Sequence, residues 1–174
     1  MPTSSPIEEL DACKYLYVES ISEPEANALR LVISEGIVSE NTETLRVDAA
    51  EISDVHAVEV TEASRWFEVL WPTYVAYSIR NESFCVWDEE EHWTGAAFRI
   101  YSVSKFLDFV ATGTFADFDY PGKFSHYGIV CSDHVIDVAS VNSPTVSRIG
   151  TQPSAGSRRG RQFEKRTSSK HSGA

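Results

Sequence analysis

The sequence predicts an α+β domain in which one amphipathic helix packs on a mainly antiparallel β-sheet. Apolar and polar side chains alternate along much of residues 1–142, which is typical of strands with one buried face. A single segment, about residues 103–112, has the spacing of a helix. The predicted strands lie before and after this helix without regular βα alternation, which favours an antiparallel sheet over a parallel one.

The first half of the chain is predicted to form strands separated by polar breaks. Alternation predicts strands over residues 15–21 and 29–34, on either side of a Glu-Pro-Glu break at 23–25, and another over 52–60. We interpret the polar run 39–44 as a loop.

The middle of the chain continues this pattern. The apolar run 66–71 is typical of a buried strand, which Pro72 interrupts because it has no N–H for the ladder. Residues 73–80 alternate again, and a return strand over 83–87 is predicted after a turn at 81–82.

The helix is predicted directly after a short strand at residues 98–101. Its apolar side chains are Val103, Phe106, Leu107 and Val110. Either Ser102 or Ser104 can cap its N-terminus, and Gly113 stands where helices commonly end. The apolar stripe should therefore pack on the sheet.

A hairpin is predicted after the helix, with strands over residues 126–131 and 134–140 joined by a two-residue turn. This register places Gly128 opposite Asp137. His126 then lies on the same face as Asp137, diagonally across, with roughly 7 Å between the Cα atoms.

Charge divides the chain into two parts. Of 174 residues, 15 are Lys or Arg and 26 are Asp or Glu, a net charge of −11. Residues 1–142 hold 8 basic and 25 acidic side chains, or −17, and are predicted to be one acidic domain. Residues 143–174 hold seven basic and one acidic side chain, or +6, and are predicted to be a disordered tail rich in Ser, Gly and Arg.

The composition also bounds location and cofactors. Cys13, Cys85 and Cys131 are an odd number at wide spacing, which argues against a disulfide framework and a cysteine zinc site. No secretory signal and no apolar run of about 18 residues is present, so we expect a cytoplasmic protein without a membrane span. We expect no metal and no cofactor.

The predicted hairpin offers candidate residues for catalysis. A carboxylate at Asp137 would orient His126 as a general base. On the neighbouring face Cys131 lies beside His134, as a thiol and a base do in nucleophilic catalysis. A small hydrolase or transferase that uses Cys131 or the His126/Asp137 pair is therefore one interpretation. The structural alternative is a packed cysteine and an ordinary polar pair.

Residues 102–105 offer a second candidate motif for catalysis. Ser102 and Lys105 have the SxxK spacing of serine acyl-transfer enzymes such as the penicillin-interacting enzymes, in which the lysine takes the proton of the serine. A serine N-cap followed by a solvent-facing lysine explains the same residues.

An acidic cluster between two tryptophans predicts a partner surface. The predicted partner-binding residues are Trp87, Asp88, Glu89, Glu90, Glu91, His92 and Trp93. Adjacent carboxylates repel one another unless a cation or a basic partner neutralises them, and the spacing of a calcium loop is absent. Aromatic anchors with charge steering are typical of interfaces, so a basic protein partner is expected. A solvated loop whose tryptophans fold into the core is the alternative.

The predicted tail and the acidic body differ in whether they could bind nucleic acid. The acidic body opposes binding to DNA, RNA or anionic lipid, so any nucleic-acid contact would fall to Arg158, Arg159, Arg161, Lys165 and Arg166. The same residues would also suit the chain's own acidic body, held nearby by the tether. A tail without any role is the third interpretation.

In composition and size, residues 66–140 resemble small acidic α+β bacterial proteins, including the immunity proteins that neutralise toxins. This resemblance and the acidic cluster lead to one hypothesis. We expect a non-enzymatic binding domain that neutralises a basic protein partner.

Overall fold

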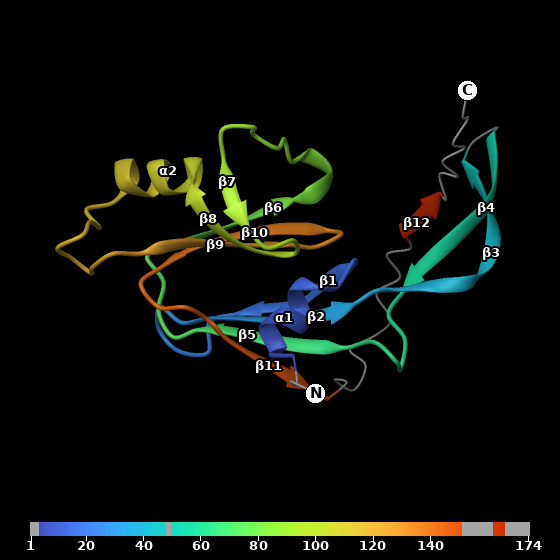
Figure 1. Ribbon diagram of the computed structural model, residues 1–174, viewed down its shortest axis with the longest axis horizontal. Coiled ribbons are helices and arrows are strands. Elements are labelled where there is room, and N and C mark those ends of the chain that lie inside the picture. Colours follow the sequence, from blue (N-terminus) through green and yellow to red (C-terminus); the bar gives the residue numbers. More distant parts are fainter. Residues whose placement is uncertain (1–3, 48–49, 151–161, 166–174) are drawn as a thin grey trace, which may run out of the picture.

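The structure is a computed structural model that describes residues 4–47, 50–150 and 162–165. Two antiparallel sheets lie face to face, and a third forms an arm (Figure 1). In spatial order the first sheet contains β1 (Leu16–Ser22), β2 (Leu29–Glu35), β5 (Trp66–Trp71) and β11 (Thr145–Ile149). The second contains β6 (Ala76–Asn81), β10 (His134–Ser140), β9 (Ser125–Val130), β8 (Phe98–Val103) and β7 (His92–Thr94). The arm contains β12 (Gln162–Lys165), β4 (Ala50–Glu59) and β3 (Ile37–Val47).

The apolar core lies between the two stacked sheets. Its largest contributors are Leu16, Leu29, Leu31, Ile33, Phe67, Val69, Trp71, Tyr127, Ile129, Ile136 and Val138. On β5 every second residue, beginning with Phe67, is fully buried, as the period of a strand requires. Burying one such side chain contributes about 1.5–3 kcal/mol, so this layer fixes how the sheets face each other.

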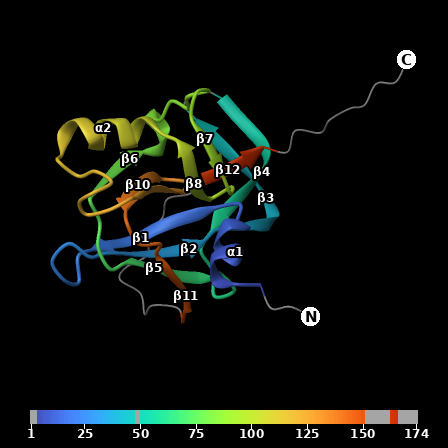
Figure 2. The same cartoon turned by 60° about the vertical axis from the view of Figure 1, so that its left-hand side comes forward.

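The predicted helix is α2 (Lys105–Gly113), which covers the outer face of the five-stranded sheet (Figure 2). It begins later than predicted, because Val103 still belongs to β8 and Ser104 is the N-cap. Val110, on this helix, is fully buried. The predicted α+β class, with an antiparallel sheet and a helix packed on it, is confirmed.

A second helix, α1 (Pro6–Asp11), was not predicted. Ser5 accepts a hydrogen bond from the Glu8 N–H, and the Glu8 carboxylate accepts one from the Ser5 N–H, forming a capping box. Pro6 occupies the first turn, where its missing N–H costs nothing. Leu10 then anchors the helix in the core.

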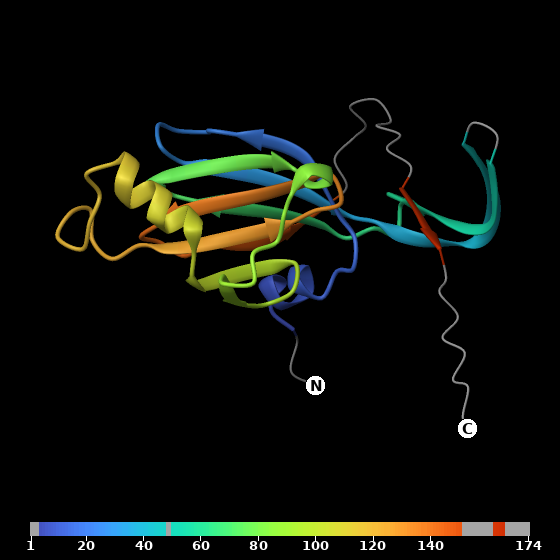
Figure 3. The same ribbon diagram turned by 90° about the horizontal axis from the view of Figure 1, so that it is seen from above.

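The arm corrects the loop predicted for residues 39–44, because this polar run lies within β3. In Figure 3 the arm extends away from the stacked sheets. Its residues 39–44 are mostly exposed, so they show no alternation of apolar side chains. The register shifts between Val38 and Thr42, which bends the hairpin as a β-bulge does.

The return strand predicted for residues 83–87 was also wrong. A 3-10 turn, η1 (Glu82–Phe84), follows β6, and the chain reaches the sheet again only at β7. Asn81 accepts the N–H of Ser83 and thereby starts this turn. Residues 85–91 remain outside the sheets as a loop.

The predicted boundary between body and tail, at residues 142 and 143, was too early. Residues of β11 pair with β5, and Arg148 forms an ion pair with Glu9 of α1. The body therefore extends at least to Ile149. The predicted disorder of residues 151–161 and 166–174 lies outside the described residues.

Within the described ranges, no helix has the length and apolar character needed to cross a membrane.

Candidate functional site

The hairpin of β9 and β10 has the predicted register and brings His126 to Asp137. Gly128 pairs with Asp137 as expected. His126 Nε2 lies 3.0 Å from Asp137 Oδ1, and both residues are buried, with 1% and 2% of their surface exposed. The predicted contact between imidazole and carboxylate is therefore present.

Ser104 extends this pair into a chain of three groups. Its Oγ lies 2.7 Å from His126 Nδ1 and also accepts the N–H of Leu107 at 3.0 Å, as the N-cap of α2. If Nε2 donates to the carboxylate, Nδ1 is the acceptor and the Ser104 hydroxyl donates to it. This is the Ser–His–Asp order of a serine-hydrolase triad, with the two ring nitrogens exchanged.

Arg80 and Ser78 of β6 hold the other carboxylate oxygen of Asp137. Arg80 donates through Nε and Nη2, at 3.1 and 3.0 Å, and the Ser78 hydroxyl donates at 3.3 Å. Burial raises the pKa of the Asp137 carboxyl, but the His126 hydrogen bond and the charge of Arg80 outweigh it, so the pKa lies below its usual value. Asp137 is therefore an anion at neutral pH.

The burial of Ser104, His126 and Asp137 favours a structural role for this set of hydrogen bonds, which Arg80 closes on its exposed side. Ser104 is only 6% exposed, and its oxygen is already used by the helix N-terminus. We refer to Ser104, His126, Asp137 and Arg80 as the buried network. It joins α2 to three strands through satisfied hydrogen bonds, which is what a buried polar group requires.

The cysteine candidate occupies a different environment. Cys131 lies opposite His134, as predicted, and its N–H donates to the His134 carbonyl at 2.8 Å. Its side chain is 2% exposed, and burial raises the pKa of the thiol well above its usual value. The His134 imidazole lies instead beside Asp133, 3.1 Å away. This environment keeps the thiol protonated, whereas a nucleophile needs the thiolate.

The two tryptophans of the acidic cluster meet around an arginine. The Arg99 guanidinium carbon lies 4.4 Å from the centre of the Trp87 ring and 4.2 Å from that of Trp93. Trp93 contacts Tyr101, which stacks on His126 with ring centres 4.0 Å apart. Such cation–π contacts stabilise the loop by about 0.5–2 kcal/mol. The loop is therefore coupled to the buried network through aromatic rings.

Gly128 explains how Tyr101 can lie flat on the sheet. A Cβ at this position would be 2.8 Å from a ring carbon of Tyr101. Only glycine therefore leaves room for the ring that connects Trp93 to His126.

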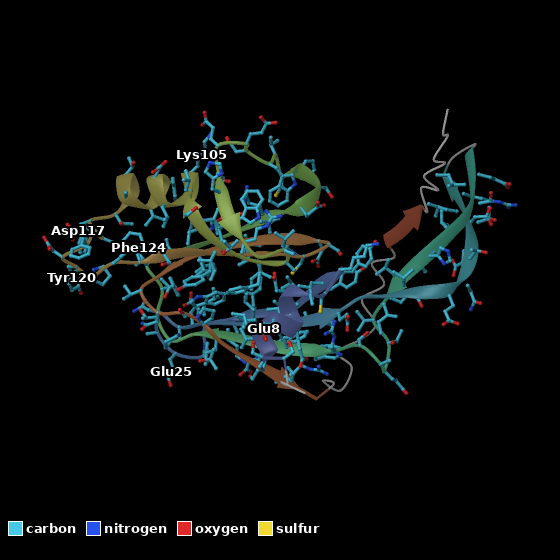
Figure 4. All side chains as sticks on the ribbon, in the orientation of Figure 1. Glu8, Glu25, Lys105, Asp117, Tyr120 and Phe124 are labelled. Atoms are coloured by element: carbon cyan, nitrogen blue, oxygen red, sulfur yellow. The ribbon has the colours of Figure 1, made fainter. Side chains whose placement is uncertain are left out.

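The carboxylates of the cluster differ in their contacts. Lys105 forms ion pairs with Asp88 and, at 3.4 Å, with Glu90. Glu91 accepts the Lys105 N–H at 2.9 Å, beside the helix N-terminus. Figure 4 shows Lys105 at this end of α2. Glu89 and Glu90 remain exposed and leave negative charge on the surface.

Apolar side chains directly precede these carboxylates. Phe84 and Val86 are 83% and 85% exposed, and Trp87 is 42% exposed. Residues 84–93 are called the acidic loop below. Large apolar side chains this open to solvent are typical of an interaction surface when they lie together.

A second group of exposed aromatic residues lies at the other end of α2. Its members are Phe109, Phe115, Phe118 and Tyr120. Phe115 and Tyr120 stack beside a groove of about 500 Å³, which Tyr74 and Val141 also line. Figure 4 shows Tyr120 and Asp117 together at this end.

Three features of the site could not be read from spacing. Ser104 was considered only as an N-cap, and the placement of Arg99 between two tryptophans depends on the pairing of β7 with β8. The exposure of the aromatic residues after α2 depends on where the helix ends. Within the described part of the chain, no group of three or more His, Cys, Asp or Glu side chains could hold a metal ion.

Comparison with known proteins gives no relative. No protein-family model, no curated protein and no solved structure matches the chain. Function must therefore be inferred from these residues and their geometry.

Proposed function

We propose that the protein is a non-enzymatic binding protein that holds a basic protein partner through the acidic loop. The exposure of Phe84, Val86 and Trp87 directly beside four carboxylates carries this proposal. Neutralising a basic toxin, as immunity proteins do, is the role we propose for such a surface.

The acidic loop is held in place before any partner arrives. The Trp87–Arg99–Trp93 stack holds the loop at Trp87 and at Trp93, and Lys105 holds Asp88. A fixed loop loses little conformational freedom on binding, which favours affinity. Phe84 and Val86 would then supply apolar area at the centre of an interface.

The charge of the loop supports a basic partner. Glu89 and Glu90 are exposed, and the whole segment 1–142 carries −17. Complementary charge accelerates encounter and disfavours acidic partners. Because exposed charges are screened by salt, binding through this loop should weaken as ionic strength rises.

The test compares variants that carry the same charge change. The full-length chain is immobilised and incubated with an extract of the cells that produce it, at about 50 mM and at about 300 mM salt. Charges are screened weakly at the lower concentration and strongly at the higher one. We expect a basic protein to be retained at low salt and lost with Glu89→Gln/Glu90→Gln. The control Glu25→Gln/Glu62→Gln, equally exposed, should retain it.

The apolar part of the surface needs its own variant. Phe84→Ser/Val86→Ser should lose the same protein at both salt concentrations, because an apolar contact is not screened. Retention of that protein by both double variants of the acidic loop would refute the proposal.

One observation favours a hydrolase as the second candidate. The Ser104–His126–Asp137 chain has hydrogen bonds of 2.7 and 3.0 Å, in the order that activates a serine. A fluorophosphonate probe tests it directly, since an activated Ser104 would displace fluoride and gain the phosphonyl mass. Labelling of the wild type but not of Ser104→Ala would support this candidate. An unlabelled wild type would remove it.

A further inference from the structure

The arm presents a strand edge on which a segment of the C-terminal region is already seated. β12 pairs antiparallel with β4, from Gln162 opposite Val58 to Lys165 opposite Val55. The other edge of β4 is taken by β3. Figure 1 shows β12 beside β4, away from the stacked sheets. The edge of β4 therefore accepts an extended segment by main-chain pairing.

The arm is acidic, and the sequence around β12 is basic, although β12 itself holds one glutamate and one lysine. Residues 37–59 hold six acidic side chains and one arginine, a net charge of −5. Residues 158–170 hold six basic side chains and one glutamate, a net charge of +5. An acidic arm thus carries a strand from the most basic part of the chain.

The paired stretch of β4 also has an apolar face. Val55 and Ala57 are buried on one face of β4, and Val58 is buried on the other. In strand addition, main-chain hydrogen bonds supply affinity and alternate side-chain positions supply specificity. This edge offers both.

We propose that the β4 edge of the arm is a strand-addition site for a basic extended peptide of a partner protein, and that β12 is its intramolecular occupant. β12 is only four residues long, which suits an occupant that exchanges. A tether makes the internal segment a competitor, so a partner binds well only when β12 leaves the edge. This site is separate from the acidic loop and does not rest on the function proposed for it.

The experiment uses the full-length chain with β12 prevented from pairing. Successive N–H groups of a strand point to opposite edges, so Phe163→Pro/Glu164→Pro removes whichever one faces β4. Thr167→Pro/Ser168→Pro, outside β12, is the matched control. The probe is a fluorescent peptide of residues 158–170, with a scrambled peptide of the same composition for comparison.

We expect the peptide to bind the Phe163→Pro/Glu164→Pro variant at least about tenfold more tightly than the wild type or the control, because the tethered competitor is gone. Within residues 55–58, the amides that face β12 should exchange slowly in the wild type, fast in the variant and slowly again with peptide bound. The amides that face β3 should stay protected throughout. Glu51→Gln/Asp54→Asn in the arm should weaken binding, whereas Glu89→Gln/Glu90→Gln in the acidic loop should not.

Four results would overturn the proposal. The variant would fail to bind the peptide, or would bind the scrambled peptide equally well, which would leave only charge attraction. A dimer of the wild type that the variant lacks would assign the edge to the tail of a second copy. Unfolding of the variant would show that β12 is a required strand and not an exchangeable occupant.

Discussion

The buried network and the acidic loop lie on the same side of the five-stranded sheet. The carboxylate of the network is buried and paired, whereas several carboxylates of the loop are exposed. Asp137 has His126, Arg80 and Ser78 as partners and almost no exposed surface. The acidic loop shares Lys105 among its carboxylates and leaves Glu89 open to solvent. A buried charge needs a partner because its removal from water is costly, whereas an exposed charge remains available to bind another protein. The residues most typical of catalysis are therefore the ones best explained as structure.

The largest effect is expected when the buried network loses its carboxylate. Asp137→Ala leaves His126 and Arg80 without their acceptor and should lower the free energy of unfolding by about 3–5 kcal/mol. Urea denaturation measures this loss. The exposed Asp119→Ala is the matched control and should change it by less than about 0.5 kcal/mol. Equal losses from both variants would mean that burial does not determine the cost of removing a carboxylate.

The same carboxylate should make stability depend on acid. Because the pKa of Asp137 is lowered in the folded protein, its stabilisation is complete above the unfolded pKa of about 3.9 and is lost as pH falls through the folded value. The difference in unfolding free energy between wild type and Asp137→Asn should therefore shrink below about pH 4. A difference that stays constant from neutral pH into this range would show that Asp137 has no lowered pKa.

Ser104 should matter less than Asp137, because it carries no charge. Ser104→Ala removes the N-cap of α2 and the partner of His126 Nδ1, at a cost of about 1–2 kcal/mol. Thermal unfolding of Ser104→Ala beside Ser102→Ala checks this, since the exposed Ser102 caps nothing. A Ser104→Ala protein as stable as the wild type would point away from structure and towards catalysis.

The smallest effect on stability is expected in the acidic loop. Phe84→Ser/Val86→Ser replaces two side chains that are more than four-fifths exposed, so the free energy of unfolding should change by less than about 0.5 kcal/mol. Loss of partner binding without loss of stability would show that these side chains serve binding and not folding. A loss above about 2 kcal/mol would mean that these side chains are packed in solution.

Sequence reasoning succeeded where one local rule determines geometry. A two-residue turn fixes the register of the β9–β10 hairpin, and this register brings His126 near Asp137. The capping box at Ser5 and Glu8 is equally local, but α1 is only six residues long and was not predicted. Ser104 reaches His126 only because α2 lies across the sheet, which no spacing in the sequence specifies.

The arm and the last body strand were missed for a different reason. A strand reveals itself by alternation only when one of its faces is buried. Residues 39–44 are mostly exposed, so β3 looked like a loop. β11 lies at the edge of its sheet in a stretch rich in polar residues and was assigned to the tail.

The ion pair between Glu9 and Arg148 joins residues 139 positions apart. During synthesis the first helix leaves the ribosome long before its partner strand exists, and β5 keeps an open edge until residue 149 has emerged. An open edge is a site for mispairing with other chains. Once β11 has paired, it is itself the edge strand, so a chain truncated before residue 145 would expose the edge of the half-buried β5 in place of the more exposed β11.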